Sequence, residues 1–189
     1  QRLVYLSGIG AADDPGLAFL RSKWQAEQEV VNGGVHYTIL RASLLFGEGD
    51  EFFNVLAGVA KALPVTPVAG DGEATFQPLA VEELAQCIVQ CFEREDLVSQ
   101  LIEVGGPEHL TYNQLVDLIT ETLEVQRAKV HLPLTVMRRV VQVLERVVPR
   151  PPATSNQLEM LSIPNTTDLD SVERWFGFRP RTVRGNIDY

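Results

Sequence analysis

The sequence is poor in the residues that build disulfide scaffolds and metal centres. It contains two cysteines and three histidines in 189 residues. Cys87 and Cys91 are separated by one helical turn within an apolar segment, a pattern typical of buried thiols on one helix face. No further Cys or His set accompanies them, so the sequence predicts neither a disulfide nor a zinc site, and no metal site at all.

Basic residues are also scarce relative to acidic ones. Lys and Arg together number 16 against 25 for Asp and Glu, which gives a net charge of −9. Because neutralising phosphates requires clustered Lys and Arg, this balance argues against nucleic acid as a partner. The basic residues gather late in the chain, between Arg127 and Arg150 and between Arg174 and Arg184, so the alternative of a local basic face stays open.

Long hydrophobic runs are missing as well. No apolar run approaches the ~18 residues of a membrane-spanning helix, and no signal-peptide pattern is visible. We therefore predict a cytoplasmic protein, with peripheral association with a membrane as the alternative. The sequence opens with Gln1-Arg2 directly before an apolar run and without a methionine, and we expect the chain to be a fragment with further sequence upstream.

What the sequence does contain is an alternation of strand-like and helix-like segments. Residues 2–6 form an apolar run, residues 17–31 show helical periodicity that stops at Asn32-Gly33-Gly34, and residues 35–41 form a second apolar run. Strand, helix and strand in this order predict a βαβ unit with a parallel sheet, hence an α/β fold.

The rest of the chain continues this alternation. Further helices are expected over residues 50–63, 82–93, 111–123, 134–148, 155–161 and 169–176, the last of them capped by Asp168. Extended segments are expected at 65–72, 75–81, 101–104 and 129–133, and a stiff proline-rich linker at 149–152.

Candidate site residues follow the first strand. Ser7 ends that strand, at the side of an open parallel sheet where ligands bind. Phe19 and Lys23 are one helical turn apart on the next helix and share a face. Lys23 is a candidate for binding a ligand, with a solvated surface lysine as the alternative, and Ser7 could equally be a turn residue.

Four segments, taken in order, resemble the C-terminal half of an extended or atypical short-chain dehydrogenase/reductase. They are Ser7 with the segment from Phe19 to Lys23, residues 40–47, residues 76–85, and residues 103–107 with the helix that Thr111 opens. The chain is most similar to the branch that holds the NAD(P)H-binding accessory subunit of respiratory complex I and its epimerase/dehydratase-like bacterial relatives. The resemblance implies the second half of a Rossmann-like sheet in residues 1–104, with interleaved pieces of the substrate lobe, and a small, mostly helical C-terminal lobe in residues 105–189.

The resemblance also implies a cofactor, NAD or NADP. Its ribose would be held by Lys23, and its nicotinamide side would be lined by Ser7, Ala42, Ser43 and Leu44. In this family a tyrosine one turn before the lysine is the general acid and base. Here Phe19 occupies that position and has no proton to exchange, while Tyr5 and Tyr37 lie on strands at the wrong offset.

The expected role of the cofactor is therefore structural or regulatory, and Ser7 is the one remaining catalytic candidate. Two alternatives stay open. The first is an active oxidoreductase or nucleotide-sugar epimerase/dehydratase that takes its acid from elsewhere. The second is a protein- or membrane-surface interaction module that uses the basic helix over residues 134–148.

The sequence lacks the Gly-x-Gly-x-x-Gly loop that binds the pyrophosphate of a dinucleotide, because the glycines after the first strand have the wrong spacing. The resemblance places that loop upstream, so we expect weak cofactor affinity from this chain alone. We also expect an open sheet edge that seeks the missing N-terminal half, another copy of the chain or a membrane-complex partner. Of the remaining polar residues, we expect Glu27 to be a solvated helix residue and Arg41 to be structural.

Overall fold

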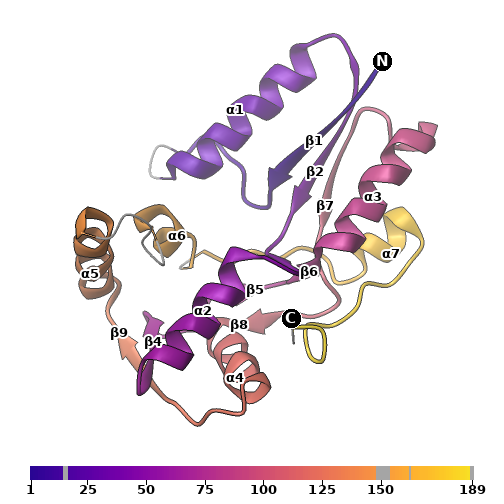
Figure 1. The fold of residues 1–189 in the computed structure, drawn as a ribbon. Helices are drawn as coiled ribbons and strands as arrows, with labels where there is room; N and C mark the ends of the chain where they lie inside the picture. Colours follow the sequence, from indigo (N-terminus) through magenta and orange to yellow (C-terminus); the bar gives the residue numbers. More distant parts are fainter. Residues whose placement is uncertain (15–16, 148–153, 162, 188–189) are drawn as a thin grey trace. The chain divides into compact units, whose positions relative to one another are not determined.

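The computed structural model describes residues 1–14, 17–147, 154–161 and 163–187 (Figure 1). The chain forms two compact units. The first consists of Gln1–Gly47, Gln77–His109 and Asn165–Val183, and the second of Glu48–Phe76, Leu110–Pro164 and Arg184–Tyr189. Each unit is assembled from separated stretches of sequence. The expected domain boundary after residue 104 stays a prediction, and the proline-rich linker at 149–152 lies outside the described residues.

The first unit is built on the expected βαβ arrangement. Strand β1 (Arg2–Gly8), helix α1 (Ala18–Asn32) and strand β2 (His36–Ala42) follow one another, and β1 pairs with β2 in parallel from Arg2↔His36 to Gly8↔Ala42. Strand β7 (Gln100–Val104) pairs in parallel with the other side of β2, which gives the order β1-β2-β7. The predicted α/β class with a parallel sheet is confirmed.

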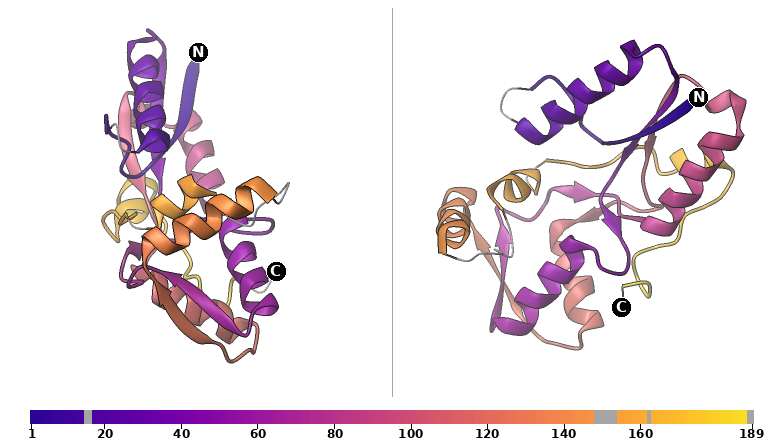
Figure 2. Two further views of the ribbon diagram at one scale, coloured as in Figure 1. Left: turned by 90° about the vertical axis from the view of Figure 1, so that its left-hand side faces the viewer. Right: turned by 45° about the horizontal axis from the view of Figure 1, so that its top comes forward.

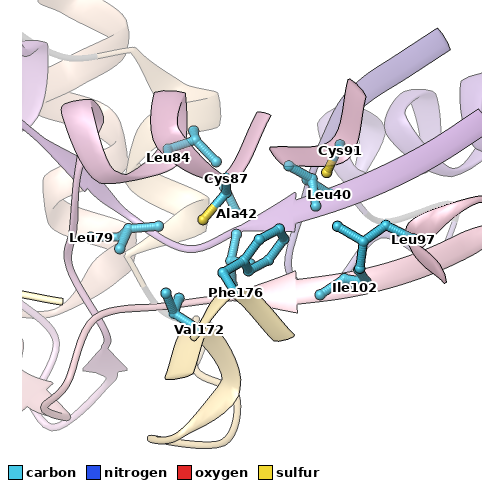
Figure 3. Close-up of a cluster of buried hydrophobic side chains, with 11 residues drawn as sticks. Leu40, Ala42, Leu79, Leu84, Cys87, Cys91, Leu97, Ile102, Val172 and Phe176 are labelled. Carbon is cyan, nitrogen blue, oxygen red and sulfur yellow. The ribbon is translucent and has the colours of Figure 1, made fainter. Parts of the chain in front are cut away.

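One face of this sheet carries the apolar core of the first unit (Figure 3). Helices α3 (Val81–Glu93) and α7 (Ser171–Phe176) pack there against β2 and β7. Cys87 and Cys91 are fully buried in this core, as the spacing predicted. Burial raises the pKa of the Cys87 thiol to about 12 and that of Cys91 to about 11.

Three short elements complete this unit. Strand β3 (Leu45–Phe46) pairs in parallel with β6 (Leu79–Ala80), and the short helix η1 (Glu95–Leu97) precedes β7. The expectation that Asp168 caps the last helix is wrong. That helix begins at Ser171, and the Asp168 carboxylate instead accepts a hydrogen bond from Arg174 Nη2 at 2.9 Å.

In the second unit, helices α2 (Glu51–Ala62) and α4 (Tyr112–Thr122) lie side by side, as both views of Figure 2 show. Both helices begin within one residue of the predicted start, and each has a side-chain cap. Asp50 Oδ1 accepts from the N–H of Phe53 at 2.6 Å, and Thr111 and Gln114 form a complete capping box.

The remaining elements of the second unit are two small strand pairs and two helices. Strand β4 (Val65–Ala69) pairs in parallel with β9 (Ala128–Leu132), and β5 (Thr75–Phe76) pairs antiparallel with β8 (Leu110–Thr111). Helices α5 (Leu134–Val147) and α6 (Ser155–Met160) follow. In the described part of the chain, no helix is both long and apolar enough to cross a membrane.

Two buried threonines predict opposite effects of the same substitution. Thr66 Oγ1 has no hydrogen-bond partner among the described residues, whereas Thr38 Oγ1 donates to the carbonyl of Leu97 at 2.7 Å. Valine has nearly the shape of threonine without the hydroxyl. We expect Thr66→Val to raise the free energy of unfolding by about 1 kcal/mol and Thr38→Val to lower it by about 1–2 kcal/mol.

Urea unfolding followed by circular dichroism measures both changes, with Thr38→Val as the matched control. A lower stability for Thr66→Val would show that its hydroxyl is satisfied in solution.

The buried cysteines should be chemically silent in the folded chain. Thiolate is the reactive form, and the raised pKa values of about 12 for Cys87 and about 11 for Cys91 keep both groups protonated near pH 8. We expect no reaction with a disulfide reagent in native buffer and reaction of both thiols in guanidinium chloride. Rapid labelling of native protein at either position would contradict the buried placement.

Candidate functional site

The predicted site residues meet at the carboxyl ends of β1 and β2. The strand register pairs Ser7 with Arg41 and Gly8 with Ala42. The chain then leaves β1 with the N–H of Ile9 donating to the carbonyl of Ala42 at 3.1 Å. Ser7 and the segment of Ala42, Ser43 and Leu44 therefore lie at one end of the sheet, where open parallel sheets bind ligands.

Lys23 reaches the same end of the sheet from α1. Its ammonium donates a hydrogen bond to the carbonyl of Leu6 at 3.0 Å. The Nζ atom also lies 5.6 Å from the centroid of the Tyr5 ring and 5.8 Å from that of Phe19. Lys23 is thus held at the end of β1 by one carbonyl and two aromatic rings, and it does not simply extend into solvent.

The two aromatic neighbours of Lys23 offer no usable proton. Phe19 is 47% exposed and carries no ionisable group. Tyr5 turns the face of its ring to the ammonium. Burial raises the pKa of Tyr5, and the negative charge of Glu27 raises it further. A general base near neutral pH needs the opposite shift, so the environment of Tyr5 argues against its replacing the missing tyrosine.

Ser7 presents a hydroxyl without a partner. The residue is 6% exposed, and its Oγ atom forms no hydrogen bond with any described residue. Because buried polar groups are nearly always hydrogen-bonded, an unpaired hydroxyl at a strand end indicates a position for a ligand atom or a water molecule.

The segment of Ala42, Ser43 and Leu44 uses its polar groups within the fold. The Ser43 hydroxyl donates to the carbonyl of Gln77, and its N–H donates to the carbonyl of Val104 at 3.0 Å. The carbonyl of Leu44 accepts from the N–H of Leu79 at 2.8 Å. The Ala42 side chain belongs to the core under α3. These hydrogen bonds hold the segment rigidly at the end of the sheet. Its contact with a cofactor stays a prediction.

Gln77 is the centre of the hydrogen bonds beside this segment. Its side chain is fully buried, donates to the carbonyl of Gly106 at 2.7 Å and accepts from the N–H of Thr167 at 2.6 Å. His109 Nε2 lies 3.2 Å from Gln77 Oε1 and 3.0 Å from the carbonyl of Thr167. Both neighbours are acceptors, so this ring nitrogen carries the hydrogen.

The two glycines after β7 make room for Gln77. A Cβ atom on Gly105 would lie 2.5 Å from the Gln77 side-chain carbonyl carbon, and one on Gly106 would collide with the carbonyl oxygen of Pro78. Only glycine allows so close an approach of two backbones. The Gly-Gly sequence after this strand therefore has a packing role.

A charge cluster, of which only Glu27 is fully buried, lies on the face of the sheet that α1 covers. Arg41 donates to Glu27 twice, from Nε at 2.9 Å and from Nη2 at 2.6 Å, and its Nη1 lies 3.8 Å from Glu103. The hydrogen bonds that Arg41 donates to Glu27 are the main cause of a raised pKa for Arg41. The expectation of a structural Arg41 agrees with this geometry.

The expectation that Glu27 is solvated is wrong, since it is 1% exposed. The sequence held one signal of this burial. Glu27 follows Leu20 and Trp24 at the spacing of the apolar helix face, where an acid requires a buried cationic partner. Among the described residues, no group of three or more His, Cys, Asp or Glu side chains is arranged to hold a metal ion.

Comparison with known proteins gives subunits of mitochondrial NADH dehydrogenase and, in addition, plant divinyl chlorophyllide a 8-vinyl-reductases. No family model matches the chain. The chain is 27% identical over 139 residues to NADH dehydrogenase [ubiquinone] 1 alpha subcomplex subunit 9 of Arabidopsis thaliana, covering 73% of this chain and 35% of that protein. It is 25% identical over 175 residues to the protein of the same name from Dictyostelium discoideum, covering 91% and 49%. The resemblance to this branch is confirmed, and the chain spans between a third and a half of these relatives' length.

Solved structures show the same fold. A NADPH-dependent quinone oxidoreductase of Escherichia coli, complexed with NADPH, superposes with a TM-score of 0.77 at 16% identity, over 98% of this chain and 64% of that chain. A nucleoside-diphosphate-sugar epimerase of Staphylococcus aureus superposes with a TM-score of 0.76 at 8% identity, over 100% and 64%. These likenesses confirm the Rossmann-like fold.

Removing the charge of Glu27 should destabilise the chain strongly. Glu27→Gln keeps the shape of the side chain but leaves Arg41 partly buried beside a neutral amide. We expect the free energy of unfolding to fall by about 3 kcal/mol. Glu29→Gln, on the exposed side of the same helix, should change it by less than about 0.5 kcal/mol.

Chemical denaturation of the two variants at the same pH provides the comparison. Equal stabilities for Glu27→Gln and Glu29→Gln would mean that the charge cluster contributes nothing to folding.

Proposed function

We propose that this chain is part of an NAD(P)-binding, atypical short-chain dehydrogenase-like protein whose cofactor has a structural or regulatory role. The observation that supports it best is the ammonium of Lys23 held at the carboxyl end of β1, 3.0 Å from the carbonyl of Leu6, with Phe19 one turn before it. This arrangement keeps the group that binds a ribose and lacks the group that moves a proton.

The residues at this end of the sheet fit a nicotinamide riboside. The ammonium of Lys23 carries more donors than the one that Leu6 uses, and the remaining ones suit ribose hydroxyls. The unpaired hydroxyl of Ser7 is suited to a hydrogen bond with the nicotinamide side of the cofactor. The proposed contacts of Ala42, Ser43 and Leu44 are apolar or through the backbone, because their internal hydrogen bonds occupy the other groups. When bound, the nicotinamide would supply hydride chemistry.

The absence of an acid is the reason to propose a role other than turnover. Hydride transfer to a carbonyl requires a proton for the oxygen, and the usual donor position is Phe19. The phenol of Tyr5 has a raised pKa and turns its ring face to Lys23. A protein with this site can bind a nicotinamide cofactor tightly enough to stabilise its fold without reacting with it.

The comparisons support cofactor binding and leave a second candidate function. Two of the relatives are named as subunits of NADH dehydrogenase, and one structural neighbour contains NADPH. The likeness in fold to a quinone oxidoreductase and a sugar-nucleotide epimerase favours an active NAD(P)-dependent oxidoreductase or epimerase as the alternative. In that case the proton comes from a group other than residue 19.

We further infer that the outer edge of β1 is where the sheet continues. In the described part of the chain, β1 pairs with β2 alone, and Leu3 and Leu6 are exposed on it. An uncovered strand with exposed leucines favours pairing with another strand. The proposed partners are an N-terminal half of the same fold, another copy of the chain or a membrane complex, and the proposed location is cytoplasmic and peripheral to a membrane.

Lys23 should determine cofactor binding. We expect weak binding of NADH or NADPH to the chain, detectable by saturation-transfer NMR, and an about tenfold loss of affinity in Lys23→Met because a charged hydrogen-bond donor is removed. Lys61→Met, an exposed lysine at the end of α2, is the matched control. Equal affinities for both variants and the unmodified chain would contradict the proposed site.

Phe19→Tyr distinguishes the two candidate functions. With a tyrosine one turn before Lys23, a disabled site should regain oxidation of NAD(P)H by a quinone, while the unmodified chain should show none. Absorbance of the reduced nicotinamide follows the reaction. Robust oxidation by the unmodified chain, unchanged by Phe19→Tyr, would replace the structural role with the active-enzyme alternative.

A further inference from the structure

Helix α5 exposes an unusual line of apolar side chains. Val136, Val140, Val143 and Val147 are 43%, 51%, 57% and 74% exposed. Their spacing along the helix places all four on one stripe, which we call the valine stripe. Val141, on a different side of the same helix, is buried. The helix therefore has a buried apolar position and, on another side, an apolar surface that no described residue covers fully.

The charged residues on one edge of α5 are used to hold α6. Arg138 Nη2 lies 3.2 Å from Glu159 Oε1. Glu145 accepts from the N–H of Ser155 at 2.9 Å and from its hydroxyl at 2.8 Å. These contacts fix which side of α5 faces α6, and they leave the valine stripe on another side.

The charges beside the valine stripe are all positive. Arg139 follows Val136, and Arg146 follows Val143, each by about one helical turn, so both arginines lie along one edge of the stripe. Neither forms an ion pair with any described residue. Although the chain carries a net charge of −9, this surface combines exposed aliphatic groups with unpaired cations.

We propose that the valine stripe of α5 docks on the surface of an anionic lipid bilayer. The valines would enter the boundary between headgroups and acyl chains, while Arg139 and Arg146 would reach the lipid phosphates. The helix would lie in the plane of the surface, since no helix in the described ranges has the length and apolarity to cross a membrane.

The charge pattern disfavours a second copy of the chain as the occupant. In a symmetric dimer through the valine stripe, the arginine edges of the two α5 helices would meet if the helices ran antiparallel, and each would meet the edge of Met137 and Leu144 if they ran parallel. In neither arrangement would an acidic residue of α5 lie at the stripe to pair with Arg139 and Arg146. A surface of phosphates satisfies these cations directly. The proposal does not depend on the cofactor site, since α5 and Lys23 belong to different units.

Vesicle binding by the full chain tests the proposal. Flotation would be compared for vesicles of phosphatidylcholine alone and for vesicles that also contain phosphatidylglycerol. We expect binding to the anionic vesicles only, weakened by added salt. The double variant Arg139→Gln/Arg146→Gln should lower the partition coefficient roughly 25-fold. Arg138→Gln is the matched control and should stay within about twofold, because Arg138 lies on the α6 edge.

A second variant tests the apolar part of the stripe. The double variant Val140→Ser/Val143→Ser changes exposed positions only. Circular dichroism would verify that the variant folds. It should reduce vesicle binding about tenfold or more. The proposal is overturned if the folded chain does not bind anionic vesicles, or if Arg138→Gln weakens binding as much as the double arginine variant. It is also overturned if the chain forms a dimer that the serine variant abolishes, and if neither the chain nor the serine variant binds vesicles.

Discussion

The ion pair between Glu27 and Arg41 determines how α1 lies on the sheet. Its two hydrogen bonds join the buried Glu27 carboxylate of the helix to the partly buried guanidinium at the end of β2. A buried carboxylate without this partner would be very costly, so the pair permits one rotation of the helix about its axis. Lys23 precedes Glu27 by one turn, and that rotation directs its ammonium to the end of β1.

A second constraint comes from the opposite side of β2. Gln77 joins Ser43, the backbone of Gly106 and the segment at Thr167 in one fully satisfied buried network. Such a network specifies a single arrangement because each group left unpaired would cost free energy. The result is a rigid strand end in which the Ser7 hydroxyl and the ammonium of Lys23 are the groups suited to a ligand.

This division explains how binding and chemistry can separate in one fold. Holding a ribose, the role proposed for Lys23, requires a fixed donor at the end of a strand, and the Glu27–Arg41 pair and the carbonyl of Leu6 fix this donor without any ionisable group at residue 19. Proton transfer requires a titratable group with a suitable pKa, and the pKa of the half-buried phenol of Tyr5 is shifted in the unfavourable direction. Loss of the acid therefore leaves the scaffold intact, which is the condition for a cofactor to keep a structural role.

The sequence by itself determined the local structure: the βαβ order, the helix that Thr111 opens and the buried cysteines followed from periodicity and capping chemistry. It also placed Ser7 and Lys23 at one strand end. The tertiary structure decided the burial of Glu27, the buried hydrogen bonds around Gln77 and the contact of Asp168 with Arg174. Helical periodicity predicts which face of a helix a residue occupies, but not which residues pack against that face. The partner of Glu27 is Arg41 on β2, a strand that pairs with β1 only after helix α1 has crossed over the sheet. The burial of Glu27 therefore depends on the assembled sheet.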